Sequence, residues 1–355
     1  MGRSMRACAL LVIGLGPAGA SAAAAAARAG HAVIAVEKKK VVGIPVQCAE
    51  FIPLPMSGYA RAETRAQPIA GMSTTLPSGA RAARAFGGLM IRRERFDQAL
   101  AKNAGDCGAL LWTDTALRAL DSKTGVARVS TASGLREVRY RMLVAADGPL
   151  SSVAACLGLP RLPIVTTRQY TVPLTRPQND TDIWLSARYP GGYAWLFPKG
   201  SVANLGLGLD PALENDMKEP LDALHESLVR EGRVGAEVLL RTGGPIAVGG
   251  LRERLVEGNA LFAGDAGGFT HPITGAGIAP AVASGERAGA AVARALSGDP
   301  HALAAYEEEM REEFGPALER ALAARRRMAD VWNTSAAEDD TEHRRGWIAF
   351  PEYFS

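Results

Sequence analysis

The stretch Gly14-Leu15-Gly16-Pro17-Ala18-Gly19 decides the fold of this chain. It links the apolar run Cys8 to Gly14 to the alanine-rich segment Pro17 to Ala29, and a second apolar run, His31 to Glu37, follows. Short continuous apolar runs are typical of buried strands, and alanine favours helix. We therefore expect a strand–helix–strand unit with a right-handed crossover.

The glycine spacing in this unit predicts a dinucleotide-binding site. Gly14 permits the tight turn, Gly16 lets the backbone approach a pyrophosphate, and Gly19 lets the helix pack closely on the sheet. The helix N-terminus supplies free N–H groups and a favourable dipole for phosphate. Glu37 follows Gly14 by 23 residues, a spacing suited to a ribose hydroxyl pair. The run Lys38 to Lys40 either attracts the phosphate or adenosine end of the nucleotide or forms a solvated turn. The predicted contacts are Gly14, Gly16, Pro17, Ala18, Gly19, Glu37 and Lys38.

A second glycine-rich segment lies near the end of the chain. The apolar run Ala260 to Asp265 reads as a parallel-type strand, and a helix is expected over Ala279 to Leu296. Asp265 can accept hydrogen bonds from a ribityl chain, and N–H groups at the helix start can stabilise negative charge on a reduced flavin ring. His271 in this loop is either an acid/base near the ring or a hydrogen-bonded loop residue. The predicted contacts here are Gly264, Asp265, Pro272, Gly275, Ala276, Gly277 and Ile278.

A third motif, Ala146-Asp147-Gly148-Pro149-Leu150-Ser151-Ser152, ends the apolar run Tyr140 to Asp147. Asp147 can contact both a flavin diphosphate and an incoming nicotinamide nucleotide. These motifs, together with Arg93-x-x-Phe96-Asp97, resemble the para-hydroxybenzoate hydroxylase superfamily of FAD enzymes over most of residues 7 to 297. The resemblance implies a bound FAD, NAD(P)H as co-substrate, and further cofactor contacts at Arg93, Asp147 and Gly148.

Two further segments resemble the geranylgeranyl reductase family within that superfamily. One is Gly43-Ile44-Pro45-Val46-Gln47-Cys48-Ala49-Glu50, and the other is Gly192-Tyr193-Ala194-Trp195-Leu196-Phe197-Pro198-Lys199. The resemblance implies that the cysteine loop lies near the flavin and that the aromatic strand lines the substrate cavity. It adds Gln47, Cys48 and Ala49 to the cofactor contacts, and it makes Cys48, Glu50, Tyr193 and Trp195 the candidate catalytic residues.

Three functions stay open from the sequence. The first is reduction of an apolar or conjugated C=C bond, with hydride from an NAD(P)H-reduced flavin and a proton from Cys48 or a nearby water. The second is monooxygenation of an aromatic small molecule or a protein side chain. The third, an FAD-binding module without turnover, rests on Ala154, which stands where the superfamily usually has an arginine.

Composition bounds the remaining possibilities. The 355 residues carry 40 basic and 37 acidic side chains, so a net charge of +3 gives no global attraction to nucleic acid. Four widely spaced cysteines predict neither a metal site nor a disulfide framework, and they favour a cytoplasmic setting. No apolar run reaches the ~18 residues of a membrane span. Peripheral membrane contact remains possible for an apolar or aromatic substrate.

The fold class expected is α/β with an α+β insert: a Rossmann-like FAD-binding domain, a mostly antiparallel substrate sheet and a C-terminal helical tail. The corresponding ranges are 1–160 with 245–300, 161–244, and 301–355. Outside the nucleotide unit, helices are expected at Arg93 to Ala104, Pro211 to Glu231 and His301 to Trp332, and strands at Gln169 to Leu174, Asp182 to Tyr189, Tyr193 to Pro198 and Val202 to Leu209.

Overall fold

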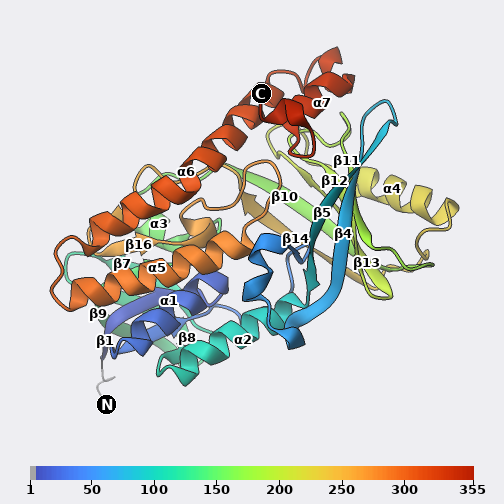
Figure 1. Cartoon of the computed structure of the whole chain (residues 1–355). Helices are drawn as coiled ribbons and strands as arrows, with labels where there is room; N and C mark the ends of the chain where they lie inside the picture. The colour runs from blue at the N-terminus through green and yellow to red at the C-terminus, as the bar shows by residue number, and fades with distance from the viewer. Residues whose placement is uncertain (1–4) are drawn as a thin grey trace.

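The computed structural model describes residues 5–355 and contains two eight-stranded sheets (Figure 1). The first sheet has the order β15-β16-β9-β1-β2-β6, with β8 on β9 and β7 on β8. Its core strands β16, β9, β1, β2 and β6 are parallel, as expected for a Rossmann-like unit. The strands are β1 Arg6–Ile13, β2 Val33–Val36, β6 Leu110–Trp112, β7 Ala116–Asp121, β8 Val126–Thr131, β9 Gly134–Ala145, β15 Val256–Glu257 and β16 Ala260–Phe262.

Helices α1 (Pro17–Arg28) and α5 (Ile278–Leu296) cover one face of this sheet and pack directly on each other. Glycines make the close approach possible. A Cβ on Gly285 would lie 2.1 Å from the Ala18 carbonyl oxygen, and one on Gly289 would lie 2.3 Å from that of Ala22. The alanines of α1 are therefore helix-packing residues, and the two nucleotide segments of the sequence meet across this contact.

The second sheet has the order β14-β10-β13-β12-β11-β4-β5-β3. It is mostly antiparallel, as expected, although β11 pairs with β4 in parallel. It also extends beyond residues 161–244, because three strands come from the first part of the chain. The strands are β3 Phe51–Pro53, β4 Arg65–Thr75, β5 Arg81–Ile91, β10 Ile164–Pro173, β11 Asp180–Trp184, β12 Ala194–Lys199, β13 Val202–Leu209 and β14 Leu240–Ala247.

The two faces of the second sheet have different partners. Leu196, Leu205 and Leu207 pack with Leu221 and Leu228 of α4 (Lys218–Arg230). The opposite face carries Trp195 and Phe197 and packs against the C-terminal segment. Period-two alternation along β12 thus separates a helix-covered face from an aromatic one.

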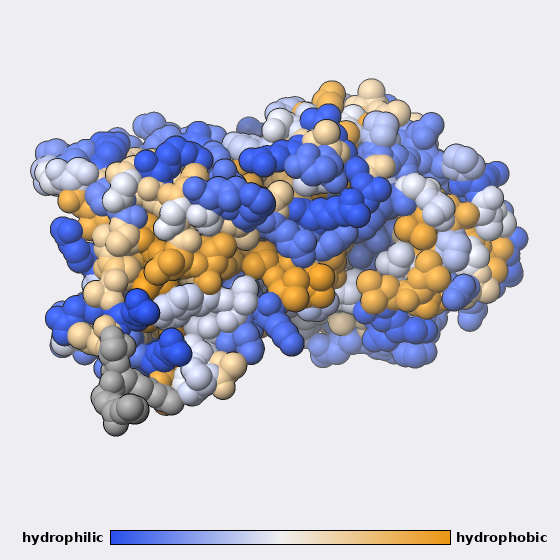
Figure 2. All heavy atoms as spheres, turned by 90° about the horizontal axis from the view of Figure 1, so that it is seen from below, coloured by the Kyte–Doolittle hydropathy of each residue, from blue (hydrophilic) through white to orange (hydrophobic). Residues whose placement is uncertain are grey.

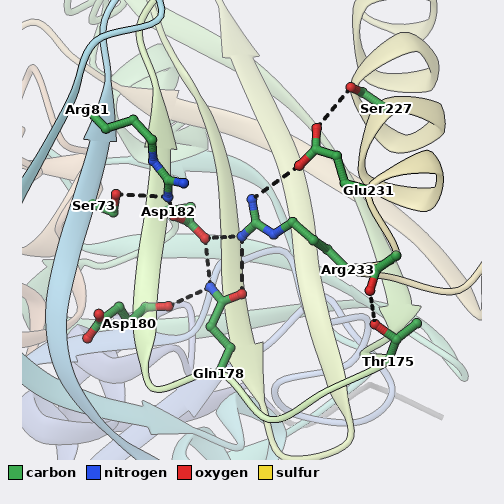
Figure 3. Close-up of polar contacts among 10 residues, drawn as sticks. Ser73, Arg81, Thr175, Gln178, Asp180, Asp182, Ser227, Glu231 and Arg233 are labelled. Carbon is green, nitrogen blue, oxygen red and sulfur yellow. Dashed lines mark hydrogen bonds and ion pairs between the residues drawn. The ribbon is translucent and has the colours of Figure 1, made fainter.

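A buried carboxylate fixes β11 to its surroundings (Figure 3). Asp182 is 5 % exposed and pairs with Arg81 of β5 at 3.0 Å and with Arg233, which follows α4. Gln178 donates to Asp182 at 2.8 Å and accepts from Arg233 at 3.2 Å. A carboxylate removed from water needs such partners, so this network joins β5, β11 and the end of α4.

The C-terminal part runs back across the molecule. Helix α6 (Ala302–Ala329) passes over α5 and reaches the second sheet, where α7 (Asp340–Gly346) follows (Figure 1). The remaining helices are α2 Arg93–Asp106 and α3 Ser152–Cys156, with short 3₁₀ turns η1 Leu54–Tyr59, η2 Ala62–Thr64, η3 Gly264–Ala266, η4 Ser335–Glu338 and η5 Pro351–Tyr353. Seen from below, hydrophobic atoms form a band across the middle of the surface, with hydrophilic atoms along its margins (Figure 2).

Several of the predicted elements have different bounds in the structure. The strand expected from Gln169, for example, begins at Ile164. The helix expected from Pro211 begins only at Lys218, after Met217 as N-cap, and Asp216 just before it accepts from the Lys218 N–H at 2.8 Å. The strand expected over Asp182 to Tyr189 ends at Trp184. No helix in residues 5–355 combines the length and hydropathy that crossing a bilayer requires.

Candidate functional site

The first nucleotide half-site lies between β1 and α1. Gly14 has φ +98°, and a Cβ there would lie 2.3 Å from the Ala146 carbonyl oxygen. A Cβ on Gly19 would lie 1.8 Å from the carbonyl oxygen of Gly14, whereas one on Gly16 would meet nothing within 4 Å. Gly16 is the N-cap of α1 and offers no side-chain cap, so the first N–H groups, beginning after Pro17, face open space. This is the form of an anion cradle.

Glu37 secures this loop from the end of β2. Its carboxylate accepts from the N–H of Leu15 and from that of Lys39, both at 2.9 Å. Each oxygen retains a lone pair for a ribose hydroxyl. Lys38 is exposed, as in the solvated-turn alternative, while Lys39 is half-buried and donates to the Pro45 carbonyl at 3.1 Å. Burial lowers the pKa of Lys39. Within the run Lys38 to Lys40, Lys39 is thus the lysine that contacts both Glu37 and the cysteine loop.

The second half-site lies at η3 and the N-terminus of α5. Asp265 accepts from the Thr270 hydroxyl at 2.6 Å, and burial raises the pKa of its carboxyl. Gly277, the N-cap of α5, has no side-chain cap, and a Cβ there would lie 2.8 Å from Thr270 Oγ1. Pro272, Gly275, Ala276 and Ile278 belong to the same loop and helix start. A Cβ on Gly264 would lie 2.9 Å from Ala18 Cβ, so the two half-sites are adjacent.

Asp147 leaves one oxygen available. Its Oδ2 accepts from the Ser152 N–H and hydroxyl, both at 2.6 Å, and from the Val153 N–H at 3.0 Å. Its Oδ1 is buried and has no partner among the described residues. The adjacent Gly148 has φ +84° and open space around it. An orphaned buried oxygen needs an occupant, and together with two uncapped helix N-termini it fits a bound FAD.

The cysteine loop crosses the second sheet one strand at a time. Two of its contacts are with β14. The Val46 carbonyl accepts from the Thr242 hydroxyl, and the Gln47 side-chain amide donates to the Gly243 carbonyl. The Cys48 carbonyl accepts from Gln169 of β10 at 3.1 Å, and the Ala49 carbonyl accepts from Asn204 of β13 at 3.2 Å. The loop is thus attached to three strands whose residues lie more than 100 positions away.

Glu50, the last residue of the cysteine loop, holds the end of the loop through its carboxylate. It is 2 % exposed and has a left-handed φ of 70°. Its oxygens accept from the Arg93 N–H at 2.9 Å, Lys199 Nζ at 2.6 Å and Asn204 Nδ2 at 2.9 Å. Glu50 is therefore not a solvated loop acid, because three donors from α2, β12 and β13 surround the group. Lys199 and Asn204 carried no recognisable signal in the sequence.

Cys48 lies beside Arg93 and presents a protonated thiol. Its sulfur accepts from the Glu50 N–H at 3.2 Å. Burial raises the pKa of the thiol, and the nearby Arg93 guanidinium offsets only part of that rise. Arg93 itself pairs with Asp97 through two contacts of 2.9 and 3.0 Å. Burial would lower the pKa of Arg93, but the Asp97 carboxylate outweighs it, so the cation persists.

The aromatic strand divides into a core part and a cavity part. Trp195 and Phe197 are 6 % and 8 % exposed. Trp195 Nε1 donates to Gln169 Oε1 at 3.1 Å, so the indole holds the amide that in turn binds the Cys48 carbonyl. Tyr193 is half-buried, and its hydroxyl donates to the Thr274 carbonyl in the second half-site at 2.6 Å. Burial raises the pKa of Tyr193, so its phenol stays neutral.

Two cavities flank the loop that contains His271 and Thr274. The larger, of about 190 Å³, lies between β3, the start of α5 and α6, and its lining is mainly apolar. Phe51, His271, Ile278 and Phe314 contribute to its walls. The smaller, of about 40 Å³, lies beside Tyr193. Burial lowers the pKa of His271 to about 4, and Nδ1 accepts from two backbone N–H groups, so this neutral imidazole is the hydrogen-bonded loop residue among the two alternatives.

Comparison with known proteins agrees with this geometry. Residues 164–244, which contain β10 to β14, match the geranylgeranyl reductase catalytic domain. The chain is 32 % identical over 335 residues to a digeranylgeranylglycerophospholipid reductase of Methanocella arvoryzae, covering 88 % of this chain and 84 % of that protein. The chain belongs to the geranylgeranyl reductase family.

Solved structures place the family within a wider fold group. A geranylgeranyl bacteriochlorophyll reductase-like protein from Thermoplasma acidophilum superposes with a TM-score of 0.87 at 26 % identity, covering 99 % of this chain and 94 % of that one. CmlS, a flavin-dependent halogenase, superposes with a TM-score of 0.74 at 18 % identity, covering 96 % and 70 %, and shares the fold alone. As a geranylgeranyl reductase family member, the protein is an FAD-dependent oxidoreductase that reduces carbon–carbon double bonds, as the first of the three sequence predictions states.

Proposed function

We propose that the substrate is a lipid with unsaturated isoprenoid chains and that Cys48 supplies the proton for each double bond reduced. The observation that carries this proposal is the cysteine loop, attached across β14, β10 and β13 so that a protonated thiol lies near Tyr193 and the flavin half-site. FAD, when bound, supplies the hydride, and NAD(P)H is the reductant that we propose for it.

The protein's own residues bind the cofactor and transfer the proton. Gly16 and the N-termini of α1 and α5 hold the anionic parts of the cofactor, and Asp147 Oδ1 is free to accept from it. Cys48 holds a proton at Sγ, and transfer of that proton to one carbon completes the addition of H⁻ and H⁺ across the double bond. Arg93 stabilises the thiolate that results through the charge beside it, and a proton from solvent then restores the thiol.

The cavity of about 190 Å³ suits the apolar part of such a substrate. A dry cavity of ~150 Å³ accepts a benzene-sized group, so this one has room for one five-carbon isoprene unit. Its walls of Phe51, Phe269, Phe314 and Leu318 exclude water from the reacting carbons. His271 and Glu313 are the ionisable groups among its lining residues.

The test is an anaerobic titration of the photoreduced holoprotein with a glycerolipid that carries geranylgeranyl chains. We expect reoxidation of the flavin with one substrate double bond saturated per flavin and, in D₂O, two deuteriums per reduced bond, one from the thiol and one from the exchangeable N5 position of the reduced flavin. Cys48→Ser should slow the reaction at least tenfold while flavin binding persists, whereas Cys107→Ser, at the end of α2, is the matched control. Failure of every isoprenoid lipid to reoxidise the flavin would exclude the proposed function. Oxygen incorporation from ¹⁸O₂ would instead support the monooxygenase alternative.

The other predictions about partners and location stay predictions. Peripheral contact with a membrane would give access to a lipid substrate, and the hydrophobic band in Figure 2 is consistent with such contact without identifying where it occurs. A cytoplasmic location, the three residue ranges for the domains and a protein side chain as substrate likewise remain untested.

A further inference from the structure

Phe51 belongs both to the larger cavity and to the aromatic face of the second sheet. It lies in β3, directly after Glu50, and contributes to the walls of the cavity of about 190 Å³. Its ring also contacts Phe197 of β12, with ring centroids 5.9 Å apart. The cavity that we assign to the substrate is therefore bounded, on the side of the second sheet, by a side chain of the aromatic cluster of that sheet.

Three contacts restrict the Phe51 ring. Phe197 meets it at an interplanar angle of 64°, and Phe86 of β5 stacks on it with ring centroids 6.0 Å apart. The ring also lies against Gly88 of β5, where a Cβ would come within 2.4 Å of two ring atoms. The missing Cβ lets the ring approach the strand this closely. Because the ring is packed in this way, it forms a fixed part of the cavity wall.

The backbone of Phe51 is also held in place. Strand β3 pairs with β5 in antiparallel register, with Phe51 opposite Met90. The preceding residue, Glu50, accepts hydrogen bonds from three donors of α2, β12 and β13. A shift of Phe51 away from the cavity would disturb both sets of bonds. The size of its side chain, rather than movement of the chain, therefore sets the position of this wall.

A second aromatic wall comes from α6 and from the loop that follows η3. Phe269 and Phe314 line the cavity and contact each other with ring centroids 5.4 Å apart and nearly perpendicular planes. Phe269 is 1 % exposed, and its ring lies against Gly267, where a Cβ would come within 2.7 Å of it. The cavity is thus bounded by packed rings on the side of α6 as well, so it cannot widen there without repacking of the core.

The volume left inside these walls has room for one isoprene unit, because a dry cavity of ~150 Å³ accepts benzene. Replacement of Phe51 by alanine would remove a benzene-sized group from the wall. The space that the ring vacates adjoins Phe86 and Phe197. The enlarged cavity would therefore take a second isoprene unit against the aromatic face of the second sheet.

We propose that Phe51 is a specificity-determining residue that limits the cavity to one isoprene unit of the substrate. Its ring fills the space next to the second sheet and keeps a second unit of the chain out of the cavity. The inference rests on the proposed function for the class of substrate, but the limit is measurable as binding even without turnover.

The experiment compares FAD-loaded wild-type protein with Phe51→Ala and Phe51→Leu. Phe86→Ala is the matched control, because Phe86 belongs to the same aromatic cluster but not to the lining of the cavity. The probes are prenyl alcohols with one, two and three isoprene units. Equilibrium dialysis gives their Kd, and reoxidation of the photoreduced flavin gives their rate of reduction. Flavin absorbance and the urea midpoint report whether each variant is folded.

We expect Phe51→Ala to raise the gain in affinity from one unit to two units at least about tenfold over wild type, because the second unit is then buried, and Phe51→Leu to raise it by a smaller factor. The gain from two units to three, and both gains in Phe86→Ala, should stay within about twofold of wild type.

Three results would overturn the limit set by Phe51. They are an unchanged gain from one unit to two in whichever Phe51 variant is folded, the same change in Phe86→Ala, and no binding of any probe by wild type or variants. If the expected Kd pattern is found but wild type reduces none of the alcohols and no isoprenoid lipid, the proposed function fails and the limit on cavity size stands.

Discussion

Removal of Lys199 tests how much the Glu50 network contributes to stability. Lys199 Nζ lies 2.6 Å from Glu50 Oε2, with side-chain exposures of 22 % and 3 %. Breaking a buried pair by removing one partner costs ~3–5 kcal/mol, because the other charge stays buried. Glu50 retains two donors, Arg93 N and Asn204 Nδ2, so we expect Lys199→Met to lower the free energy of unfolding by about 3 kcal/mol, the lower end of that range.

Two further variants distinguish the contribution of the ion pair from the contributions of the two individual side chains. Glu50→Gln should cost about 1–2 kcal/mol, because the exposed end of Lys199 can turn to solvent. Adding Glu50→Gln to Lys199→Met should recover about 1–2 kcal/mol, since no unpaired carboxylate remains. Lys102→Met is the matched control. Its pair with Asp106 has the same 2.6 Å separation, but its side chains are 75 % and 62 % exposed, so we expect a loss below about 0.5 kcal/mol.

The assay is urea unfolding at a fixed free FAD concentration, because bound cofactor adds to stability by mass action. If Lys199→Met is as mild as Lys102→Met at pH 8, the pair is not a buried one in solution and our reasoning is wrong.

Three other predictions follow from the same contacts. Gly19→Ala should lower stability by about 2 kcal/mol or more and weaken FAD binding, because its Cβ would lie 1.8 Å from Gly14 O; Gly16→Ala, with open space around it, should weaken only FAD binding, as fluorescence titration would show. The pKa of His271 is lowered to about 4 from 6.5, so the unfolded chain binds more protons between these values and stability falls as pH drops through this window. His271→Asn should remove up to about 2 kcal/mol of the loss between pH 7 and pH 5, and an unchanged pH profile would contradict the assignment. Asp182→Ala should cost about 3 kcal/mol, because the buried guanidinium of Arg233 would keep only the Gln178 amide and a 3.9 Å pair with the exposed Glu231, against less than about 1 kcal/mol for Arg128→Met at an exposed pair, both measured in urea.

Local patterns predicted the nucleotide half-sites because their signals lie close together in the chain. Gly14, Gly16 and Gly19 define a strand-to-helix turn by spacing alone, and the structure places an uncapped helix start there. Trp195 and Phe197 of β12 likewise share one face because they are two positions apart in a strand. In both cases the physical cause is local backbone geometry.

The partners of Glu50 and Cys48 could not be found in this way. Lys199 is 149 positions from Glu50, and Gln169 is 121 positions from Cys48. Contacts between residues so far apart in sequence leave no periodic pattern, because they depend on how the cysteine loop packs on the second sheet. The assignment of β4 to that sheet has the same origin, since β4 pairs in parallel with β11, which lies more than 100 positions later. Trp347 gave no argument from the sequence because its partner Tyr193 lies more than 150 positions earlier in the chain.

Glu50 links the cysteine loop to α2 and to the second sheet. Its left-handed φ of 70° is unfavourable for a side chain with a Cβ, by roughly 1–2 kcal/mol, yet three donors from α2, β12 and β13 converge on its carboxylate. One of these donors is the backbone N–H of Arg93, the first residue of α2, and the guanidinium of the same residue lies beside Cys48. The N–H of Glu50 itself donates to the Cys48 sulfur. Because the same residue attaches α2 to the substrate sheet and orients the thiol, a shift of the sheet relative to the cofactor half-sites would move the thiol with it. The buried carboxylate therefore couples the position of the thiol, which we propose as the proton source, to the position of the second sheet, and the proposed addition across a double bond requires such fixed positions.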